Sequence, residues 1–342
     1  QASQSKSMFL ATVSHELRTP LYGIIGNLDL LQTKALPKGV DRLVTAMNNS
    51  SSLLLKIISD ILDFSKIESE QLKIEPREFS PREVMNHISA NYLPLVVRKQ
   101  LGLYCFIEPD VPEQMSGDPM RLQQVISNLL SNAIKFTDTG CIVLHVQCAG
   151  DYLQISVRDT GEGIPAKEVL RLFDPFFQVG TGVQRNFQGT GLGLAICEKL
   201  ISMMDGDISV DSEPGMGSQF TLRIPLYGAQ YPLKKGVEGL AGTRCWLAVR
   251  NASLYHFLES SLKRNGMTVL RYEGQQPDAD DLLVADDVLE QAWQGRAAVI
   301  FCRRHIGIPL EREPGEWIHS VASPHELPAL LAHIYSVDLG SE

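Results

Sequence analysis

A histidine and a glutamate stand side by side in the stretch from Phe9 to Leu31, which reads as one amphipathic helix. Winding at about 100° per residue puts His15 roughly opposite the apolar stripe, with Thr19 on the same outward face. A neutral imidazole is a nucleophile near pH 7, and the neighbouring Glu16 can hold its other ring nitrogen as a donor. By position alone, however, a solvated surface histidine is the ordinary interpretation.

Pro20 interrupts this helix, at a cost of about 3 kcal/mol. Its ring crowds the carbonyl group of Glu16, four residues earlier. We therefore expect a bend just beyond His15, which gives the imidazole room to meet a large partner.

A second set of polar side chains lies on the helix expected over residues 118–136. Asn128, Asn132 and Lys135 recur at i, i+4 and i+7 on an otherwise apolar helix. Amide oxygens suit a hard cation such as Mg²⁺, and a lysine suits phosphate oxygens. The alternative is an ordinary polar helix edge.

Asp159 ends a predicted strand and is followed by two glycines, Gly161 and Gly163. A carboxylate at this place can accept the amino group of adenine, and glycines let the backbone approach a flat base. Taken alone, the same pattern also fits a plain turn.

Three further glycines, Gly189, Gly191 and Gly193, precede or open another predicted helix. Free N–H groups and the helix dipole at such a place can bind a phosphate. Residues 179–187 before them form a polar, glycine-containing loop suited to a mobile lid. The aromatic residues of 173–177 would by default be core.

These motifs need three domains to position them. Residues 1–70 carry two apolar stripes separated by a break at 33–39, which predicts an αα-hairpin. One hairpin has too little core to stand alone, so two copies should pair as a dimeric four-helix bundle. A linker coiled coil is the alternative. The stripes are Leu10, Val13, Leu17, Leu21, Ile24, Leu28 and Leu31, then Val40, Leu43, Met47, Leu54, Ile57 or Ile58, and Ile61.

Residues 71–228 mix helices and strands. Ser80, Pro81 and Glu83 form a capping box with proline at the first helical position. The strands are expected to be antiparallel, with helices on one face, as an α+β sandwich. Residues 229–241 are polar and turn-rich and read as a linker, and residues 242–338 alternate as a small open parallel α/β sheet.

Composition excludes some functions. A net charge of −9 argues against a nucleic-acid partner. Six scattered cysteines without paired spacing indicate reduced thiols and no metal site. The sequence contains no 18-residue apolar run and no signal peptide. Because it begins inside a predicted helix, the chain is expected to be part of a longer protein.

Together, the motifs resemble those of bacterial hybrid sensor histidine kinases. "HELRTP" from His15 matches the H box, while "NLLSNAIKF", "DTGEGIP", "LFDPFF" and "GTGLGL" match the N, G1, F and G2 boxes. The resemblance implies a dimerisation and phosphotransfer bundle and an ATP-binding domain of the gyrase, Hsp90 and histidine kinase type. It also implies a phosphorelay: His15 is autophosphorylated from Mg-ATP, and the phosphoryl group passes to a receiver aspartate, with phosphatase activity in reverse.

The resemblance also assigns roles to single residues. His15 is the phosphoacceptor, Glu16 its orienting base, and Thr19 positions water or the acceptor during dephosphorylation. Asn132, with Asn128, is the Mg²⁺ ligand; related ATPases have a water-activating glutamate at the position of Asn128. The other nucleotide contacts would be Lys135, Phe136, Asp159, Gly161, Gly163, Phe177, Gly189, Thr190, Gly191, Leu192, Gly193 and Thr221.

The last domain resembles a degenerate receiver. Arg250 and Asn251 stand where an acidic pair belongs, and Ser323 replaces the usual lysine. Asp286 and Asp287 occupy the acceptor position, although a solvated turn is the simpler interpretation. The expected partners are a second copy, a true receiver downstream in the full-length protein and a phosphotransfer protein. The chain would be the cytoplasmic portion of an inner-membrane protein. A gyrase-type ATPase and a pseudokinase scaffold are the alternative functions.

Overall fold

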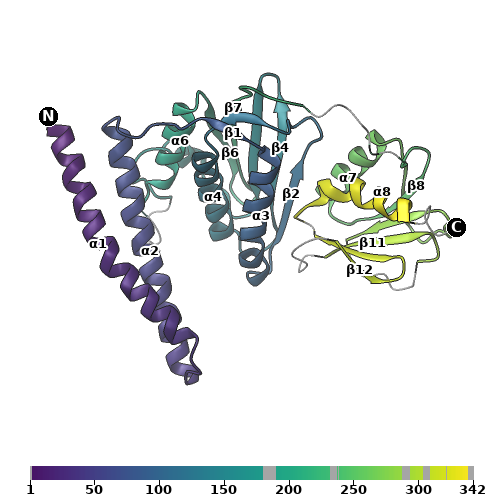
Figure 1. The fold of residues 1–342 in the computed structure, drawn as a ribbon, viewed down its shortest axis with the longest axis horizontal. Helices are drawn as coiled ribbons and strands as arrows, with labels where there is room; N and C mark the ends of the chain where they lie inside the picture. The colour runs from purple at the N-terminus through teal and green to yellow at the C-terminus, as the bar shows by residue number, and fades with distance from the viewer. Residues whose placement is uncertain are drawn as a thin grey trace. The chain divides into compact units, whose positions relative to one another are not determined.

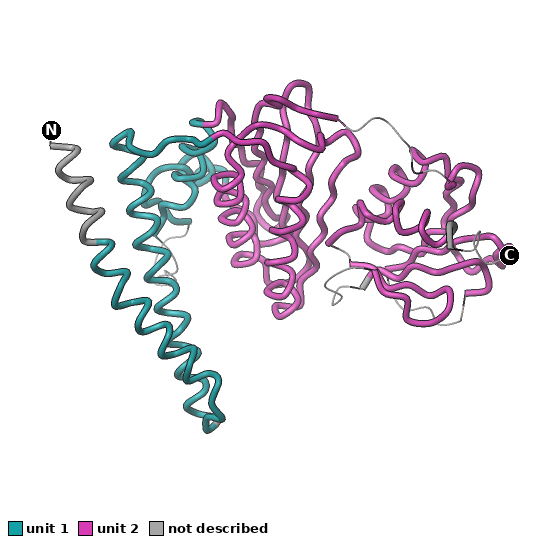
Figure 2. Tube along the Cα trace, viewed as in Figure 1, with its two compact units in different colours: residues 1–75, 166–203 teal, residues 76–165, 204–342 magenta. Residues whose placement is uncertain are grey.

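The computed structural model describes residues 2–179, 190–231, 237, 239–286, 293–302, 309–320 and 322–337. It divides into two compact units (Figure 2). One comprises residues 1–75 and 166–203, and the other comprises residues 76–165 and 204–342.

The first unit begins with the expected helical hairpin, α1 (Ala2–Gln32) and α2 (Lys38–Glu68), which lie side by side (Figure 1). Only part of the predicted apolar stripes is buried between them. Of the predicted positions, Leu21 and Leu28 of α1 and Ile58 of α2 are buried. Val44 and Leu62 of α2 are buried as well, although the predicted stripe did not include them. The other long apolar side chains of the stripes, Leu17, Ile24, Leu31, Val40, Leu43, Met47 and Leu54, are exposed in the single chain. The hairpin therefore has a second apolar face.

The same unit contains α5 (Ala166–Val169) and α6 (Gly193–Met203). Lys199 of α6 lies 3.7 Å from Glu68 near the end of α2. This ion pair is exposed at both ends and contributes little free energy.

In the second unit, a five-stranded sheet has the order β2-β4-β5-β7-β6. Its strands are β2 (Gly102–Ile107), β4 (Cys141–Ala149), β5 (Tyr152–Asp159), β6 (Asp207–Glu213) and β7 (Gly217–Pro225). The prediction of antiparallel strands is wrong for one pair, because β2 and β4 are parallel. A short antiparallel pair, β1 (Arg77–Phe79) and β3 (Met115–Gly117), was not expected.

Two helices, α3 (Pro81–Arg98) and α4 (Pro119–Phe136), cover one face of this sheet (Figure 1). The predicted capping residues explain where they begin. The Ser80 hydroxyl accepts a hydrogen bond from the Glu83 N–H at 3.3 Å, and the Asp118 carboxylate accepts one from the Arg121 N–H at 3.1 Å.

The C-terminal part of the same unit has a six-stranded sheet in the order β12-β13-β11-β10-β8-β9. The strands are β8 (Arg244–Ala248), β9 (Thr268–Arg271), β10 (Leu282–Ala285), β11 (Ala297–Cys302), β12 (Leu310–Glu313) and β13 (Glu316–Ser320). All pairs except β12-β13 are parallel, which confirms the small open sheet. Its helices are α7 (Ala252–Arg264) and α8 (Leu327–Val337), with a 3₁₀ turn η1 (Pro324–Glu326) before α8. The hairpin β12-β13 was missed.

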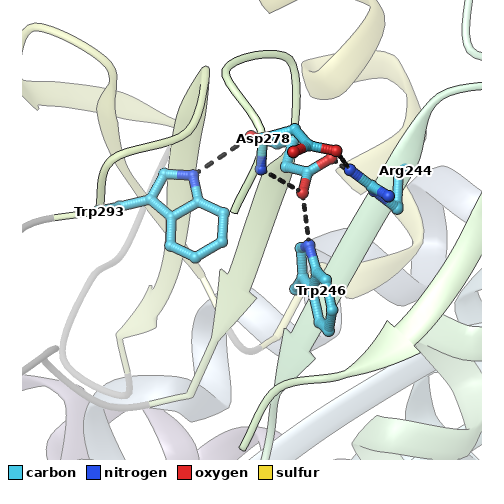
Figure 3. Close-up of polar contacts among 5 residues, drawn as sticks. Arg244, Trp246, Asp278 and Trp293 are labelled. Carbon is cyan, nitrogen blue, oxygen red and sulfur yellow. Dashed lines mark hydrogen bonds and ion pairs between the residues drawn. The ribbon is translucent and has the colours of Figure 1, made fainter. Parts of the chain in front are cut away.

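A loop over residues 272–281 joins β9 to β10 without a helix. Asp281 at its end is 2% exposed and organises the loop together with the four residues labelled in Figure 3, Arg244, Trp246, Asp278 and Trp293. Its carboxylate accepts hydrogen bonds from the Arg244 side chain at 2.7 Å, the Trp246 indole at 2.8 Å and the Asp278 N–H at 2.9 Å. The Trp293 indole donates to its carbonyl oxygen at 3.2 Å, and Arg244 also pairs with Asp278. A buried carboxylate with this many donors is a structural centre for the loop.

Two other predictions concern cysteines and membranes. Of the six cysteines, none of the five whose side chains are described forms a disulfide, as expected for reduced cysteines. None of the helices in the described part of the chain has the length and apolar content needed to cross a bilayer.

Candidate functional site

His15 lies on α1 with an exposed side chain, as the helical winding predicted. Thr19 lies one turn after His15, and its hydroxyl donates a hydrogen bond to the backbone carbonyl of His15 at 3.2 Å. Glu16 is exposed beside it, and Pro20 lies inside the helix, which continues to Gln32. The imidazole is therefore accessible to a large partner from the face that carries Thr19.

The polar residues of α4 lie along the edge of its buried face. Asn128 and Asn132 are half-buried, and Lys135 is exposed near the end of the helix. The Lys135 ammonium is 4.8 Å from the ring centroid of Phe136. Two amide side chains and an ammonium group thus follow one edge of a helix whose other side is core, as the sequence predicted.

Sequence reasoning missed the residue that fixes the end of α4. The Lys99 ammonium donates to the carbonyl oxygens of Ile134 at 2.6 Å, Lys135 at 3.2 Å and Thr137 at 2.7 Å. A cation at these carbonyls satisfies groups that the helix leaves without partners and opposes the negative end of its dipole. No local signal could have found it, because Lys99 reaches α4 from the end of α3.

Asp159, at the end of β5, is only 7% exposed. One carboxylate oxygen, Oδ1, accepts hydrogen bonds from the Gly161 N–H at 2.8 Å and the Ser218 N–H at 3.3 Å. Burial raises the pKa of this carboxyl, and the two backbone donors oppose the shift. Because both donors use Oδ1, Oδ2 is the oxygen that remains for a ligand.

The glycines after Asp159 are required by close backbone contacts. A Cβ atom on Gly161 would lie 2.3 Å from the carbonyl oxygen of Phe136, the last residue of α4. Gly163 has a φ of +70°, and a Cβ there would lie 2.1 Å from the carbonyl oxygen of Glu213. Gly161 thus allows the segment after β5 to lie against the end of α4, which carries the polar edge, and Gly163 allows it to lie against the end of β6.

The structure does not bring Thr221 together with Asp159. Thr221 pairs with Ser156 across β5, whereas Ser218 pairs with Asp159. Successive strand residues point to opposite faces, so Thr221 lies on the other face of the sheet. Ser218 is the residue of β7 next to Asp159, and the sequence analysis did not identify it. Its side chain is buried, and its hydroxyl is hydrogen-bonded to the Ser212 hydroxyl at 2.9 Å.

In the first unit, the expected phenylalanine and glycine segments contact each other. The Phe176 N–H donates to the Gly191 carbonyl at 2.9 Å, and both residues have a positive φ, +64° and +71°. A Cβ on Gly191 would lie 2.7 Å from the carbonyl carbon of Phe176. The Phe177 ring lies 4.6 Å from the Arg171 guanidinium. Phe177 is half-buried and has this cation–π partner, whereas Phe176 is 67% exposed, so the expectation of core aromatics is wrong for Phe176.

Thr190 connects this segment to the hairpin. Its hydroxyl donates to Asp60 of α2 at 3.2 Å and accepts from the Leu192 N–H at 3.1 Å. Burial raises the pKa of the Asp60 carboxyl. Gly193 begins α6 directly afterwards, so backbone N–H groups of a helix N-terminus follow the glycines, as predicted. Gly189 and the expected lid, apart from Val179, lie outside the described residues.

The donor set fits magnesium better than a transition metal. Within the described ranges, there is no group of three or more His, Cys, Asp or Glu side chains that could hold a metal. Mg²⁺ commonly takes only one or two protein oxygens and fills its shell with phosphate oxygens and water. The amide oxygens of Asn128 and Asn132 meet that requirement.

Family models match three parts of the chain. The His Kinase A (phospho-acceptor) domain matches residues 5–70, and the "Histidine kinase-, DNA gyrase B-, and HSP90-like ATPase" matches residues 117–228. The "RcsC Alpha-Beta-Loop (ABL)" model matches residues 245–335. The chain therefore belongs to the sensor histidine kinases.

Two relatives among the sensor histidine kinases are similar to this chain over its whole length. The chain is 87% identical over 342 residues to "Sensor histidine kinase RcsC" of Salmonella typhi and 85% identical to that of Escherichia coli strain K12. Both matches include the whole chain but only 36% of the relative, so the chain spans about a third of their length. These identities confirm the resemblance of the motifs to those of sensor histidine kinases and extend it to the whole sequence.

More distant relatives share its domains. "Signal transduction histidine-protein kinase BarA" of Escherichia coli is 43% identical over 232 residues, which is 66% of this chain and 25% of BarA. Among solved structures, full-length ShkA in complex with AMPPNP is similar with a TM-score of 0.70 and 26% identity. That match includes 86% of this chain and 64% of ShkA.

The expected receiver-like domain needs correction. Residues 245–335 match the ABL model rather than a receiver, and the described loop of residues 272–281 contains no crossover helix. Asn251, at an expected acid position, caps α7 through a 2.9 Å hydrogen bond from the Leu254 N–H. Asp286 accepts hydrogen bonds from the Arg250 and Asn251 N–H groups, at 2.8 and 3.1 Å, which agrees with the structural-turn interpretation. Asp287 lies outside the described residues.

Proposed function

We propose that this chain is the kinase part of a two-component phosphorelay protein. It transfers the γ-phosphoryl group of ATP to His15 and then passes it to an aspartate of a receiver domain. The observation that carries the proposal is the buried Asp159, held by two backbone donors beside the glycine segment and the polar edge of α4. That arrangement supports nucleotide binding in a chain whose exposed histidine supplies the acceptor.

The Oδ2 atom of Asp159 binds adenine by accepting a hydrogen bond from the amino group of the base. Gly161 and Gly163 allow the base to approach the backbone. Ser218 takes the place that the sequence gave to Thr221. Asn132 and Asn128 are the residues that would hold Mg²⁺ through their amide oxygens, and the ion would supply neutralisation of charge on the phosphates. The further contacts proposed for the nucleotide are Lys135, Phe136, Phe177, Gly189, Thr190, Gly191, Leu192 and Gly193.

In the transfer step, an imidazole nitrogen of His15 forms a bond to the γ-phosphorus as the bond to the ADP oxygen breaks. Glu16 orients the ring and takes the proton from its other nitrogen. Thr19 positions a water or the acceptor aspartate when the phosphoryl group leaves. Asn128 cannot act as a base toward water, so its presence favours transfer to histidine over hydrolysis.

The proposed organisation of the protein follows from the same domains. Residues 1–70 form the phosphotransfer domain, 71–228 the ATP-binding domain, 229–241 the linker and 242–338 the ABL domain. Exposed apolar side chains of the hairpin support pairing with a second copy. We propose a receiver and a phosphotransfer protein as reaction partners, and a cytoplasmic place in an inner-membrane protein.

The test is incorporation of label from γ-labelled Mg-ATP by the unaltered chain and by His15→Gln. Acid-labile, alkali-stable label that is absent from the variant is the expected result. Equal labelling of both proteins would refute His15 as the acceptor. If neither is labelled although both bind ATP, the scaffold alternative is favoured.

A further inference from the structure

The ABL domain and the ATP-binding domain share one hydrophobic core. On the five-stranded sheet, Cys105 faces α3 through Ser89, so Tyr104 and Phe106 of β2 lie on the opposite, outer face. Tyr104, Phe106 and Val143 of this outer face join the buried cluster of the ABL domain. Phe106 stacks on Phe257 of α7, with ring centroids 4.8 Å apart and an interplanar angle of 22°. All six residues of β2 are buried as a result.

Polar contacts surround this shared core. The Glu108 carboxylate bonds to the His145 ring at 3.1 Å and accepts from Arg264 of α7 at 3.3 Å. The hydrogen bond from His145 lowers the pKa of Glu108, against the effect of burial. Near η1, the Asn86 side chain donates to Glu326 at 3.3 Å. The contact therefore has an apolar centre and a polar rim, as a specific interface does.

One contact of α7 reaches β5, the strand that carries Asp159 and thus the carboxylate proposed to bind adenine. The Arg158 guanidinium donates to the Ser253 hydroxyl of α7 at 3.0 Å. Arg158 pairs with Val143 across the sheet and is followed directly by Asp159. Neighbouring residues of a strand point to opposite faces, so β5 presents Arg158 to α7 and Asp159 to the proposed nucleotide site.

We propose that the ABL domain is a built-in positive regulator of nucleotide binding, docked on the outer face of the kinase sheet and acting through β5 on Asp159. Ser253 and Arg158 are positioning residues in this coupling. The proposal rests on the proposed nucleotide site. Linkage requires the coupling to be reciprocal: docking strengthens nucleotide binding, and nucleotide binding stabilises docking by the same factor.

The test uses the full chain and Mg-AMPPNP as the probe, with affinity from calorimetry and docking from amide hydrogen exchange. Phe106→Asp places a charge in the shared core, where it has no partner, and the side chain becomes solvated if the domains separate. We expect faster exchange in Gly102–Ile107 and Ala252–Arg264 and at least a fivefold loss of affinity. Ser253→Ala removes only the bond to Arg158, and a smaller loss in the same direction is expected.

Lys263→Ala is the matched control, because Lys263 lies on the same helix but pairs with Glu259 at 2.8 Å. It should change neither readout. In the unaltered chain, Mg-AMPPNP should slow exchange in α7. Failure of the unaltered chain to bind Mg-AMPPNP would refute the proposed function itself. If it binds, then unchanged exchange in Phe106→Asp would refute docking, and increased exchange with unchanged affinity would refute the coupling.

Discussion

Asp159 is a residue whose burial is unfavourable for the charged side chain and yet suits the ligand proposed for it. Its burial disfavours the charged carboxylate, and two backbone N–H groups directed at Oδ1 recover part of that cost. The pKa of Asp159 is nevertheless raised, so burial is the larger effect. A carboxylate kept at such a cost fits a ligand that supplies a further donor, as the amino group of adenine would.

The first prediction concerns Asp159→Asn. Because its folded-state pKa lies above the unfolded value, about 3.9, protonation of this carboxyl gives stability that is complete below the unfolded value and is lost as the pH rises through the folded-state pKa. At pH 7, the variant should therefore be at least as stable as the unaltered chain in urea, yet bind Mg-AMPPNP more than tenfold more weakly. Asp151→Asn, at an exposed aspartate in the turn between β4 and β5, is the control. Lower stability with unchanged affinity would contradict the assignment.

The pH dependence of binding gives a second readout of the same residue. Since the pKa of Asp159 is raised, protonation should weaken Mg-AMPPNP binding at a higher pH than for an ordinary aspartate. Asp159→Asn should lose this part of the pH profile. A profile shared by the chain and the variant would assign the effect to another group.

Sequence spacing was sufficient for residues whose signal is local. His15, the polar residues of α4 and the glycines after Asp159 were found from positions within a few residues of each other. Lys99 and Ser218 were not, because each reaches the site from a distant element. Thr221 was assigned to the nucleotide by the resemblance, but its register against β5, which the sequence does not report, places it on the opposite face of the sheet from Asp159.

At the scale of elements, α4 is fixed at both ends. Asp118 caps the beginning, and Lys99 binds three carbonyl oxygens at or just beyond its end. Residues near the C-terminal end, Asn132 and Lys135, are those proposed to meet the metal and the phosphates. The position of this end therefore matters for binding as well as for stability.

Lys99→Met tests the second anchor. The variant leaves the carbonyl oxygens of the last turn without their charged donor. We therefore expect the free energy of unfolding to fall by about 1–3 kcal/mol and Mg-AMPPNP to bind more weakly. Urea unfolding and calorimetry measure the two effects. Lys73→Met, at an exposed lysine, should change neither. Unchanged stability in Lys99→Met would show that water replaces the ammonium at no cost.

Elements with strong periodicity were predicted well, and pairing was predicted less well. The hairpin and its break at 33–39 follow from local patterns, as do the capped α3 and α4. The parallel pairing of β2 with β4 depends on contacts distant in sequence, which periodicity does not report. The strand β12 was not predicted, because its residues, "LERE", are mostly charged and show no apolar alternation; all four are exposed in the structure.

At the scale of the whole molecule, the hairpin carries apolar surface that a single chain does not bury. Ile24 is 51% exposed and Leu43 is 61% exposed, although both belong to the stripes expected to form a core. A half-buried stripe on a long hairpin is expected where a second hairpin completes a four-helix bundle. The sequence indicated this bundle. It could not show which residues of each stripe pack within one hairpin and which remain for the contact with a second hairpin.

Ile24→Glu tests the dimer. A charge at the centre of the proposed bundle has no partner there, so the variant should sediment as a monomer under conditions in which the unaltered chain is a dimer. Leu95→Glu, at a leucine of α3 that is 44% exposed, should remain a dimer. A monomeric unaltered chain, or a dimeric Ile24→Glu, would contradict pairing through the hairpin.

The most direct measurement is the fate of the γ-phosphate in a single turnover with γ-labelled Mg-ATP, with label on the protein and in inorganic phosphate followed together. Transfer to His15 predicts that label appears on the protein as ATP disappears, with little free phosphate, and that His15→Gln consumes no ATP. Free phosphate released at the same rate by both proteins, without labelled protein, would show that the nucleotide site hydrolyses ATP, and it would contradict the kinase account.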